Sequence, residues 1–102
     1  MAKLVVLYNP PADPAAFDEY YEARHVPLAK LVPGLRDVHV STGPVMTPAG
    51  PAPYHRIAML GFDSVSALQA GFSSTQGQAA VADLANFASG GATMLIFEDK
   101  AL

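Results

Sequence analysis

One segment of the chain brings together residue types that can move protons. Its letters are YYEARHVPL over residues 20–28, and Pro33-Gly34-Leu35 follow shortly after. On a helix, Tyr21 and His25 are four residues apart on the same face, so their side chains can line one cavity. A histidine titrates near neutral pH, and a phenol can hydrogen-bond to an enolate or carbonyl oxygen as charge develops there. The pair therefore suits proton-transfer chemistry on a small, enolisable substrate.

The same residues also have ordinary structural interpretations. A histidine on the apolar side of a helix is commonly a hydrogen-bonded core residue, and neighbouring tyrosines such as Tyr20 and Tyr21 commonly pack in a core with their hydroxyls reaching water. Arg24 is either a cation at the end of a helix or an anchor for an anionic group. We take Tyr21 and His25 as candidate catalytic residues, and Tyr20 and Arg24 as candidate substrate-binding residues.

Three further residues are candidates for binding a substrate: Tyr8, His39 and His55. Tyr8 closes the first expected strand. His39 lies on the side of its expected strand opposite Val38 and Val40, so it faces either solvent or a cavity, and solvent is the usual case for a strand histidine. His55 and Arg56 begin the next strand and point to opposite faces, so we expect one of them to reach the pocket or a dimer interface.

Metal and nucleotide sites are not indicated. His25, His39 and His55 are 14 and 16 residues apart on separate elements, which is not a metal-ligand spacing. Asn9-Pro10-Pro11 stands directly after the first strand, where a glycine-rich phosphate loop would begin. The chain has no cysteine, so thiol chemistry is excluded. We therefore expect no cofactor and no metal.

The elements that position these residues follow from hydrophobic periodicity and from cap and turn residues. Asp13 and Pro14 start a helix that we expect to end near Arg24 or His25, because Pro27 disfavours a helical residue before it. The other expected elements are strands at 3–8, 35–42, 54–62 and 93–98, a loop at 43–53, and helices at about 64–72 and 75–89. This order predicts a single α+β domain over residues 1–102, of the ferredoxin-like βαββαβ type, with a four-stranded antiparallel sheet and its helices on one face.

The strands are too apolar for a sheet with one face in water. The first, third and fourth expected strands carry apolar residues on both of their faces, although helices can cover only one. The exposed apolar face of such a sheet would have a larger area than the exposed apolar patches of monomeric proteins usually have. The pattern therefore predicts a homodimer in which two sheets pack face to face around a two-fold axis.

Composition excludes several classes of partner. Of the 102 residues, 51% are hydrophobic and 15% are charged, and the net charge is −3 with six scattered basic residues. Nucleic-acid binding requires clustered Lys and Arg, so it is not expected. We also expect no membrane segment, because no apolar run approaches the ~18 residues that a spanning helix needs. No signal-peptide pattern is visible at the N-terminus, so we expect a soluble, cytoplasmic protein.

The motif Tyr20-Tyr21, three residues, His25, any residue, Pro27-Leu28, followed by Pro-Gly-Leu, resembles the EthD family, which is named for ether degradation. The second aromatic position is often Trp in that family and is Tyr21 here. The resemblance extends over essentially the whole chain and implies a dimeric α/β-barrel. It also implies kinship with cofactor-free isomerases, polyketide cyclases and monooxygenases. The related monooxygenases place a polar residue where Tyr8 closes the first strand. The family is commonly grouped with oxidoreductases because of its pathway setting, and the resemblance implies a functional role for His25.

The residues and the resemblance together predict a small enzyme without cofactor. The leading hypothesis is an isomerase, cyclase or dehydratase acting on a small hydrophobic carbonyl or phenolic compound, with His25 moving the proton and Tyr21 orienting the substrate. Two alternatives stay open. One is a non-catalytic accessory protein that binds a metabolite for an oxygenase pathway. The other is a cofactor-free monooxygenase, although those enzymes rely on a Trp that this chain lacks.

Overall fold

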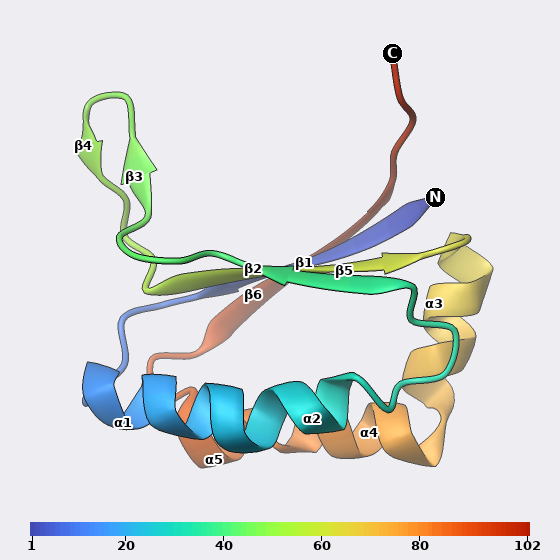
Figure 1. The fold of residues 1–102 in the computed structure, drawn as a ribbon, viewed down its shortest axis with the longest axis horizontal. Helices are drawn as coiled ribbons and strands as arrows, with labels where there is room; N and C mark the ends of the chain where they lie inside the picture. The colour runs from blue at the N-terminus through green and yellow to red at the C-terminus, as the bar shows by residue number, and fades with distance from the viewer.

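The computed structural model describes residues 1–102 and has a four-stranded antiparallel sheet with all its helices on one face (Figure 1). The strand order is β2-β5-β1-β6. The strands are β1 (Ala2–Tyr8), β2 (Asp37–Val40), β5 (Arg56–Phe62) and β6 (Ala92–Glu98). This topology confirms the ferredoxin-like α+β fold that the sequence predicts. None of the helices has the length and apolarity required to cross a membrane.

The first helical segment is longer than the sequence suggests. Asp13 caps α1 (Pro14–Tyr20) by accepting a hydrogen bond from the N–H of Ala16 at 3.1 Å. The helix then continues through a π-helical turn, η1 (Tyr21–His25), into α2 (Val26–Ala29). The expected end before Pro27 is therefore wrong. The N–H of Val26 donates to the carbonyl of Tyr21, five residues back, and this wider turn precedes a proline that cannot donate a hydrogen bond.

The segment expected to be a loop at 43–53 contains a small hairpin. Its strands are β3 (Met46–Thr47) and β4 (Gly50–Pro51), which pair with each other and not with the main sheet. The hydroxyl of Thr47 closes the turn by donating to the carbonyl of Gly50 at 3.0 Å, and Gly50 adopts a φ of 142° that other residues rarely reach. The hairpin projects from the side of the sheet opposite the helices (Figure 1).

Three consecutive helices follow β5. They are α3 (Val65–Ser73), α4 (Thr75–Ala82) and α5 (Leu84–Phe87). Ser74 caps α4 by accepting a hydrogen bond from the N–H of Gly77 at 3.0 Å. A Cβ on Gly77 would lie 2.2 Å from the carbonyl oxygen of Gly71, so α3 and α4 meet in a junction that requires glycine.

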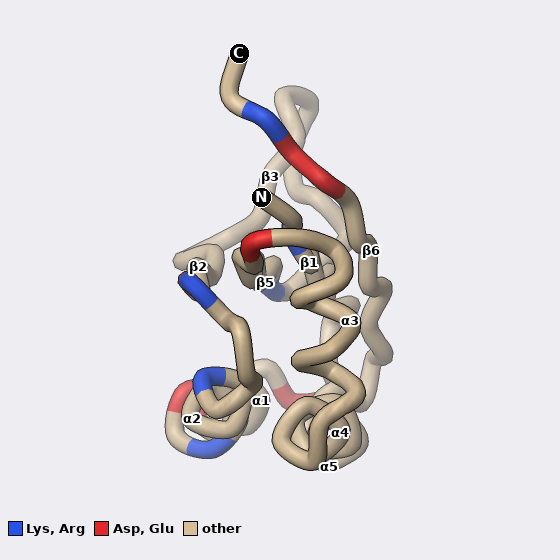
Figure 2. Tube along the Cα trace, turned by 90° about the vertical axis from the view of Figure 1, so that its right-hand side faces the viewer, with Lys and Arg blue, Asp and Glu red and all other residues tan.

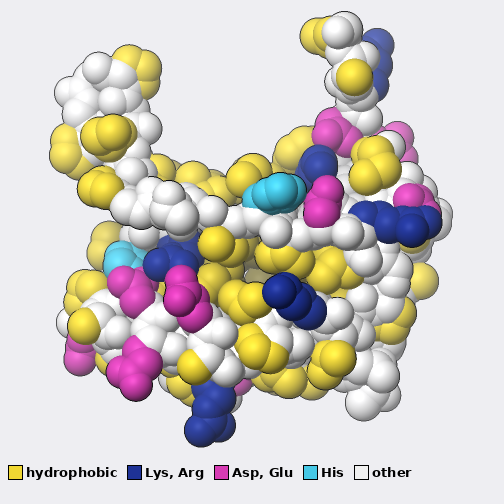
Figure 3. Space-filling model, viewed as in Figure 1, with side chains coloured by type: hydrophobic (Ala, Val, Ile, Leu, Met, Phe, Trp, Pro, Cys, Tyr) yellow, Lys and Arg dark blue, Asp and Glu magenta, His cyan; other side chains and the backbone are white.

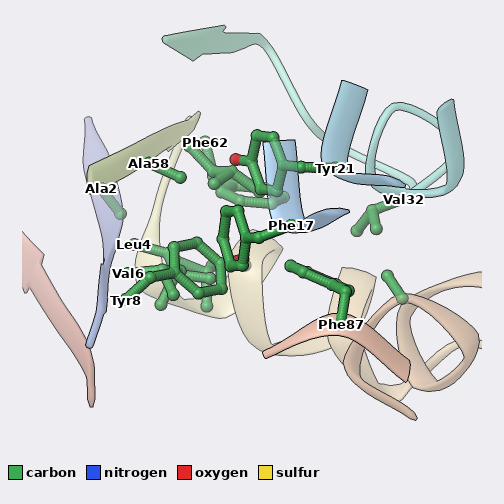
Figure 4. Packing of buried hydrophobic residues seen from close by; sticks show 13 residues of the cluster. Ala2, Leu4, Val6, Tyr8, Phe17, Tyr21, Val32, Ala58, Phe62 and Phe87 are labelled. Atoms are coloured by element: carbon green, nitrogen blue, oxygen red, sulfur yellow. The ribbon is translucent and has the colours of Figure 1, made fainter. Parts of the chain in front are cut away.

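The core lies between the sheet and the helices (Figure 4). The helix-facing residues of β1 alternate with half-buried ones, and Tyr8 at its end is almost fully buried. Aromatic rings fill the centre: the Phe17 ring centroid is 5.3 Å from that of Tyr8, 5.6 Å from that of Tyr21 and 5.1 Å from that of Phe87. These edge-on and stacked contacts fix the first helical segment and α5 against the end of β1.

The opposite face of the sheet is open. The apolar side chains on it come from three strands: Val5, Leu7, Ile57, Met59, Leu95 and Phe97. Of these, Met59, Leu95 and Phe97 are 40% to 48% exposed. The two-faced apolarity of the strands that the sequence predicts is therefore present in the fold.

Candidate functional site

The π-helical turn places Tyr21 and His25 in the core beneath the sheet. Tyr21 is 2% exposed and His25 is 7% exposed, and their ring centroids are 5.5 Å apart. The structure therefore brings the two candidate catalytic residues together, as the i, i+4 spacing predicts. Single π-helical turns within α-helices are frequently found at functional sites.

Asp83 is the residue that sequence reasoning missed. It lies at the start of α5, and its Oδ2 atom is 2.9 Å from Nδ1 of His25. Its Oδ1 atom accepts hydrogen bonds from the hydroxyl of Tyr20 at 2.6 Å and from the side-chain amide of Asn86 at 2.9 Å. Both candidates Tyr20 and His25 thus converge on one buried carboxylate.

The charge of Asp83 determines which nitrogen of His25 is free. Burial raises the pKa of Asp83, but the hydrogen bonds from Tyr20, Asn86 and His25 outweigh burial and hold the pKa below its ordinary value. An ionised carboxylate only accepts hydrogen bonds, so Nδ1 of His25 carries the proton that it donates. The remaining ring nitrogen, Nε2, then has a lone pair in the neutral imidazole. This arrangement gives His25 the form of a base.

Two phenols complete the polar part of the site. Burial raises the pKa of Tyr21 to about 12, against the opposing effect of the Arg56 guanidinium, which lies 5.0 Å from the centre of the Tyr21 ring. Burial also raises the pKa of Tyr8, and a hydrogen bond with Tyr21 adds to the effect. Both hydroxyls therefore stay protonated at neutral pH. The hydroxyl of Tyr21 can donate a hydrogen bond to a substrate oxygen, and neither hydroxyl can act as a base there.

His25, Tyr8 and Tyr21 line a cavity of about 40 Å³ between the sheet and the helices. Its other walls are hydrophobic and come from the helix-facing side of the sheet and from α2, α3, α4 and α5. The imidazole and the two phenols are the only groups along this wall that can exchange protons or donate hydrogen bonds from a side chain. The cavity therefore presents an imidazole and two phenols on an otherwise apolar wall.

The structure places the other candidates outside this cavity. His55 lies on the far side of Phe17, with its Nε2 atom 2.8 Å from Oδ1 of Asp18, and Arg56 shares the same oxygen at 3.1 Å. His39 is exposed on the open face of the sheet, where it pairs with Met59. Arg24 is exposed on the outer side of the helix.

Asp83 has a sequence signal, although it is weak. It is the only charged residue between Ser64 and Phe97, a stretch that supplies three helices and most of a strand. A single carboxylate in so apolar a segment needs a partner, because burying an unpaired charge is costly. The sequence alone does not identify that partner as His25.

Comparison with known proteins finds matches over most of the chain. A family model described as the EthD domain matches residues 9–91. An uncharacterized 11.0 kDa protein from the thcB–thcC intergenic region of Rhodococcus erythropolis is 41% identical over 100 residues, which are 98% of this chain and 96% of that protein. The crystal structure of an ethyl tert-butyl ether degradation (EthD) family protein from Bacillus halodurans is 35% identical, with a TM-score of 0.89, and the match covers 98% of this chain and 99% of that one.

A more distant likeness concerns the fold alone. SnoaB, a cofactor-independent oxygenase from Streptomyces nogalater, is 11% identical, with a TM-score of 0.70. The match covers 99% of this chain and 94% of that one.

Proposed function

This chain belongs to the EthD family, and from that premise we propose that it is a cofactor-independent enzyme of the isomerase, cyclase or dehydratase type, acting on a small hydrophobic carbonyl or phenolic compound. The observation that carries the proposal is the contact of His25 with Asp83 at the wall of an apolar cavity. An imidazole held by an ionised carboxylate is a general base in a medium where water competes little for the substrate.

The proposed mechanism uses only side chains of the chain itself. Nε2 of His25 takes a proton from the carbon next to the substrate carbonyl, and the C–H electron pair moves onto the oxygen to give an enolate. The hydroxyl of Tyr21 donates a hydrogen bond to this oxygen, and the charge of Asp83 stabilises the imidazolium. His25 then returns the proton to a different carbon in an isomerase, or to a leaving hydroxyl group in a dehydratase.

The first half of this mechanism can be tested without the natural substrate. In deuterium oxide, proton abstraction from a neutral enolisable ketone such as 1-phenyl-2-propanone replaces its α-hydrogens by deuterium, which proton NMR measures. We expect the protein to accelerate this exchange and His25→Gln to lower the catalysed rate by about 10²- to 10⁴-fold, the usual contribution of a general base. The matched control is His39→Gln, because His39 is exposed on the other face of the sheet.

Two results would contradict the proposal. Equal exchange rates in the wild type and in folded His25→Gln would show that His25 is not the base. A His25→Gln variant that fails to fold, as followed by circular dichroism, would assign His25 a structural role. Two further measurements separate the alternatives: binding of the ketone without any exchange favours a metabolite-binding protein, and oxygen uptake with a hydroquinone favours a cofactor-free monooxygenase.

The open sheet face supports a homodimer. Its centre consists of Val5, Met59 and Leu95, which are neighbours across three strands. The hairpin and the C-terminal tail both project on this side of the sheet (Figure 1). No Lys, Arg, Asp or Glu occurs between Val38 and Tyr54, and the hairpin surface shows hydrophobic side chains among uncharged atoms (Figure 3). A second copy, related by a two-fold axis, would cover the sheet face and pack against both projections.

A further inference from the structure

A larger apolar groove adjoins the cavity beside His25. The groove has a volume of about 310 Å³, against about 40 Å³ for the inner cavity. The two share four lining residues, Leu4, Phe72, Val81 and Met94. The cavity and the groove therefore adjoin at these four side chains, and the groove extends from there along α3 and α4 toward β6.

The groove exists because the helices leave part of β6 uncovered. Ile96 pairs with Leu4 and Met94 pairs with Val6, so all four side chains lie on the helix-facing side of the sheet. Leu4 and Val6 are buried, whereas Met94 is 42% exposed and Ile96 is 52% exposed. β6 is an edge strand of the sheet, and the helices leave these two side chains only partly covered. Two large hydrophobic side chains thus remain available on the inner face of the sheet.

The walls of the groove carry no charge. Asp83 is the only charged residue between Ser64 and Phe97, and it faces His25 and Tyr20 instead of the groove. Along α3, α4 and the part of β6 beside them, Figure 2 shows no acidic or basic residue. The polar side chains at the groove are Gln69 and Ser73, at its rim on α3. A charged ligand group would find no counter-ion here, while an apolar one would be removed from water.

The inner cavity alone is too small for most carbonyl or phenolic compounds. About 40 Å³ accommodates only a few water molecules, since one water needs at least ~10–15 Å³ of such volume. A reactive head group can enter only if side chains at the junction, such as Met94, move aside, and the rest of the molecule must then lie outside the cavity. The groove is the continuation that the structure offers.

We propose that the groove binds an uncharged apolar tail of the substrate whose reactive head lies beside His25. The inference rests on the proposed function and narrows its substrate class to a neutral carbonyl or phenolic head that carries an apolar chain or a second ring. The tail packs between Phe72 and Val81 on the helices and Met94 and Ile96 on β6. The length of the tail then determines affinity, while the chemistry stays at His25.

The test uses 4-alkylphenols from 4-methylphenol to 4-hexylphenol as probes. Dissociation constants come from calorimetry, and the NMR signal of the His25 ring reports whether the head reaches the site. Burial of each methylene group should tighten binding about fourfold until the groove is filled. In Ile96→Trp the indole fills the groove, so this gain should vanish while 4-methylphenol binds as before. Ile96→Val, which leaves the groove open, is the matched control and should retain the gain.

Three outcomes would overturn the inference. An equal gain per methylene in Ile96→Trp would place the tail elsewhere and leave the proposed function intact. Tail-dependent binding that never moves the His25 signal would show that the groove and the cavity hold separate ligands. Dissociation of a dimer in Ile96→Trp would identify a second copy as the occupant of the groove. The ketone exchange reaction tests the proposed function separately, because it measures proton abstraction at His25 and not the gain in affinity from a longer tail.

Discussion

Nδ1 of His25 lies 2.9 Å from Oδ2 of Asp83, although the two residues are 58 positions apart in the chain. This contact joins the first helical segment to the start of α5 at the wall of the apolar cavity. Oδ1 of the same carboxylate is occupied by two other donors, from Tyr20 and Asn86. Asp83 therefore has a fixed orientation, with one oxygen bound to the imidazole and the other to the two remaining donors.

Replacing Asp83 with Asn should reverse the tautomer of His25. The donors from Tyr20 and Asn86 require an oxygen at the Oδ1 position, so the amide NH₂ of the new side chain must face His25. Nδ1 then has to accept a hydrogen bond, and the ring proton moves to Nε2, which no longer has a lone pair for the substrate. Nitrogen-15 NMR of the imidazole distinguishes the two tautomers. The ketone exchange rate should fall by about 10²- to 10⁴-fold, as for His25→Gln.

A retained Nδ1–H tautomer in Asp83→Asn would contradict this prediction. The triple variant in which Tyr20→Phe and Asn86→Ala accompany Asp83→Asn is the informative control. Without donors at the Oδ1 position, the amide is free to turn its oxygen toward His25, so the Nδ1–H tautomer and part of the exchange activity should return.

Asp83 should also make the fold sensitive to acid. Its pKa in the folded state lies below the ordinary carboxyl value because three hydrogen bonds outweigh the cost of burial. A carboxyl group with a depressed pKa stabilises the fold above its unfolded pKa of ~3.9, and this stability is lost as the pH falls through the folded pKa. The free energy of unfolding by urea should therefore fall below about pH 4. In Asp83→Asn it should be lower by about 1–3 kcal/mol at pH 6 and depend less on pH.

The parts of the fold that depend on neighbouring residues could be predicted from the sequence. Asp13 and Pro14 indicate the start of the first helix. The runs of apolar residues indicate the strands and show that three of them are apolar on both faces. The π-helical turn could not be predicted, because its residue types and their spacing are also those of an ordinary α-helix. The hairpin was also missed: prolines and glycines indicate turns, but they do not indicate whether the residues beside Thr47 and Gly50 pair with each other.

In the candidate site, too, only the contact between residues close together in the sequence could be predicted. Tyr21 and His25 lie one helical turn apart, so their contact is a local property of the chain. The contacts of Asp83 with His25 and Tyr20 depend on how α5 packs against the first helical segment, and no local pattern encodes that packing. His39 and His55 were equally plausible from their types, and only the arrangement of the sheet and of Phe17 separates them from the cavity.

Tyr21 should make the fold sensitive to alkali. Its pKa is about 12 in the folded protein, because burial disfavours the phenolate, whereas an unfolded tyrosine titrates near 10. A raised pKa stabilises the fold fully below pH ~10, and this contribution disappears as the pH rises through the folded pKa. For Tyr21 alone the loss amounts to roughly 3 kcal/mol.

The comparison of wild type with Tyr21→Phe measures this contribution, since phenylalanine keeps the ring in place and cannot titrate. The free energy of unfolding by urea should fall more steeply between about pH 10 and 12 in the wild type than in the variant. Parallel curves for the two proteins would show that Tyr21 ionises as readily in the fold as in the unfolded chain.

The open sheet face should lose its partner when a charge is placed at its centre. Leu95 is 48% exposed, lies opposite Val5 in the sheet register and has apolar neighbours on the same face. Leu95→Lys would bury an ammonium group between two sheets without a counter-ion. We expect it to weaken dimer formation by about 2 kcal/mol or more, the size of a typical interface hot spot, which is about 30-fold in the dissociation constant. Sedimentation velocity over a range of concentrations should therefore show a dimer for the wild type and mainly monomer for the variant.

Ile96→Lys is the control for this prediction, because the side chain of Ile96, next to Leu95 on the same strand, points to the opposite face of the sheet and lines the groove. If Ile96→Lys dissociates the protein and Leu95→Lys does not, the second copy sits on the helix side of the sheet and the face-to-face arrangement is wrong.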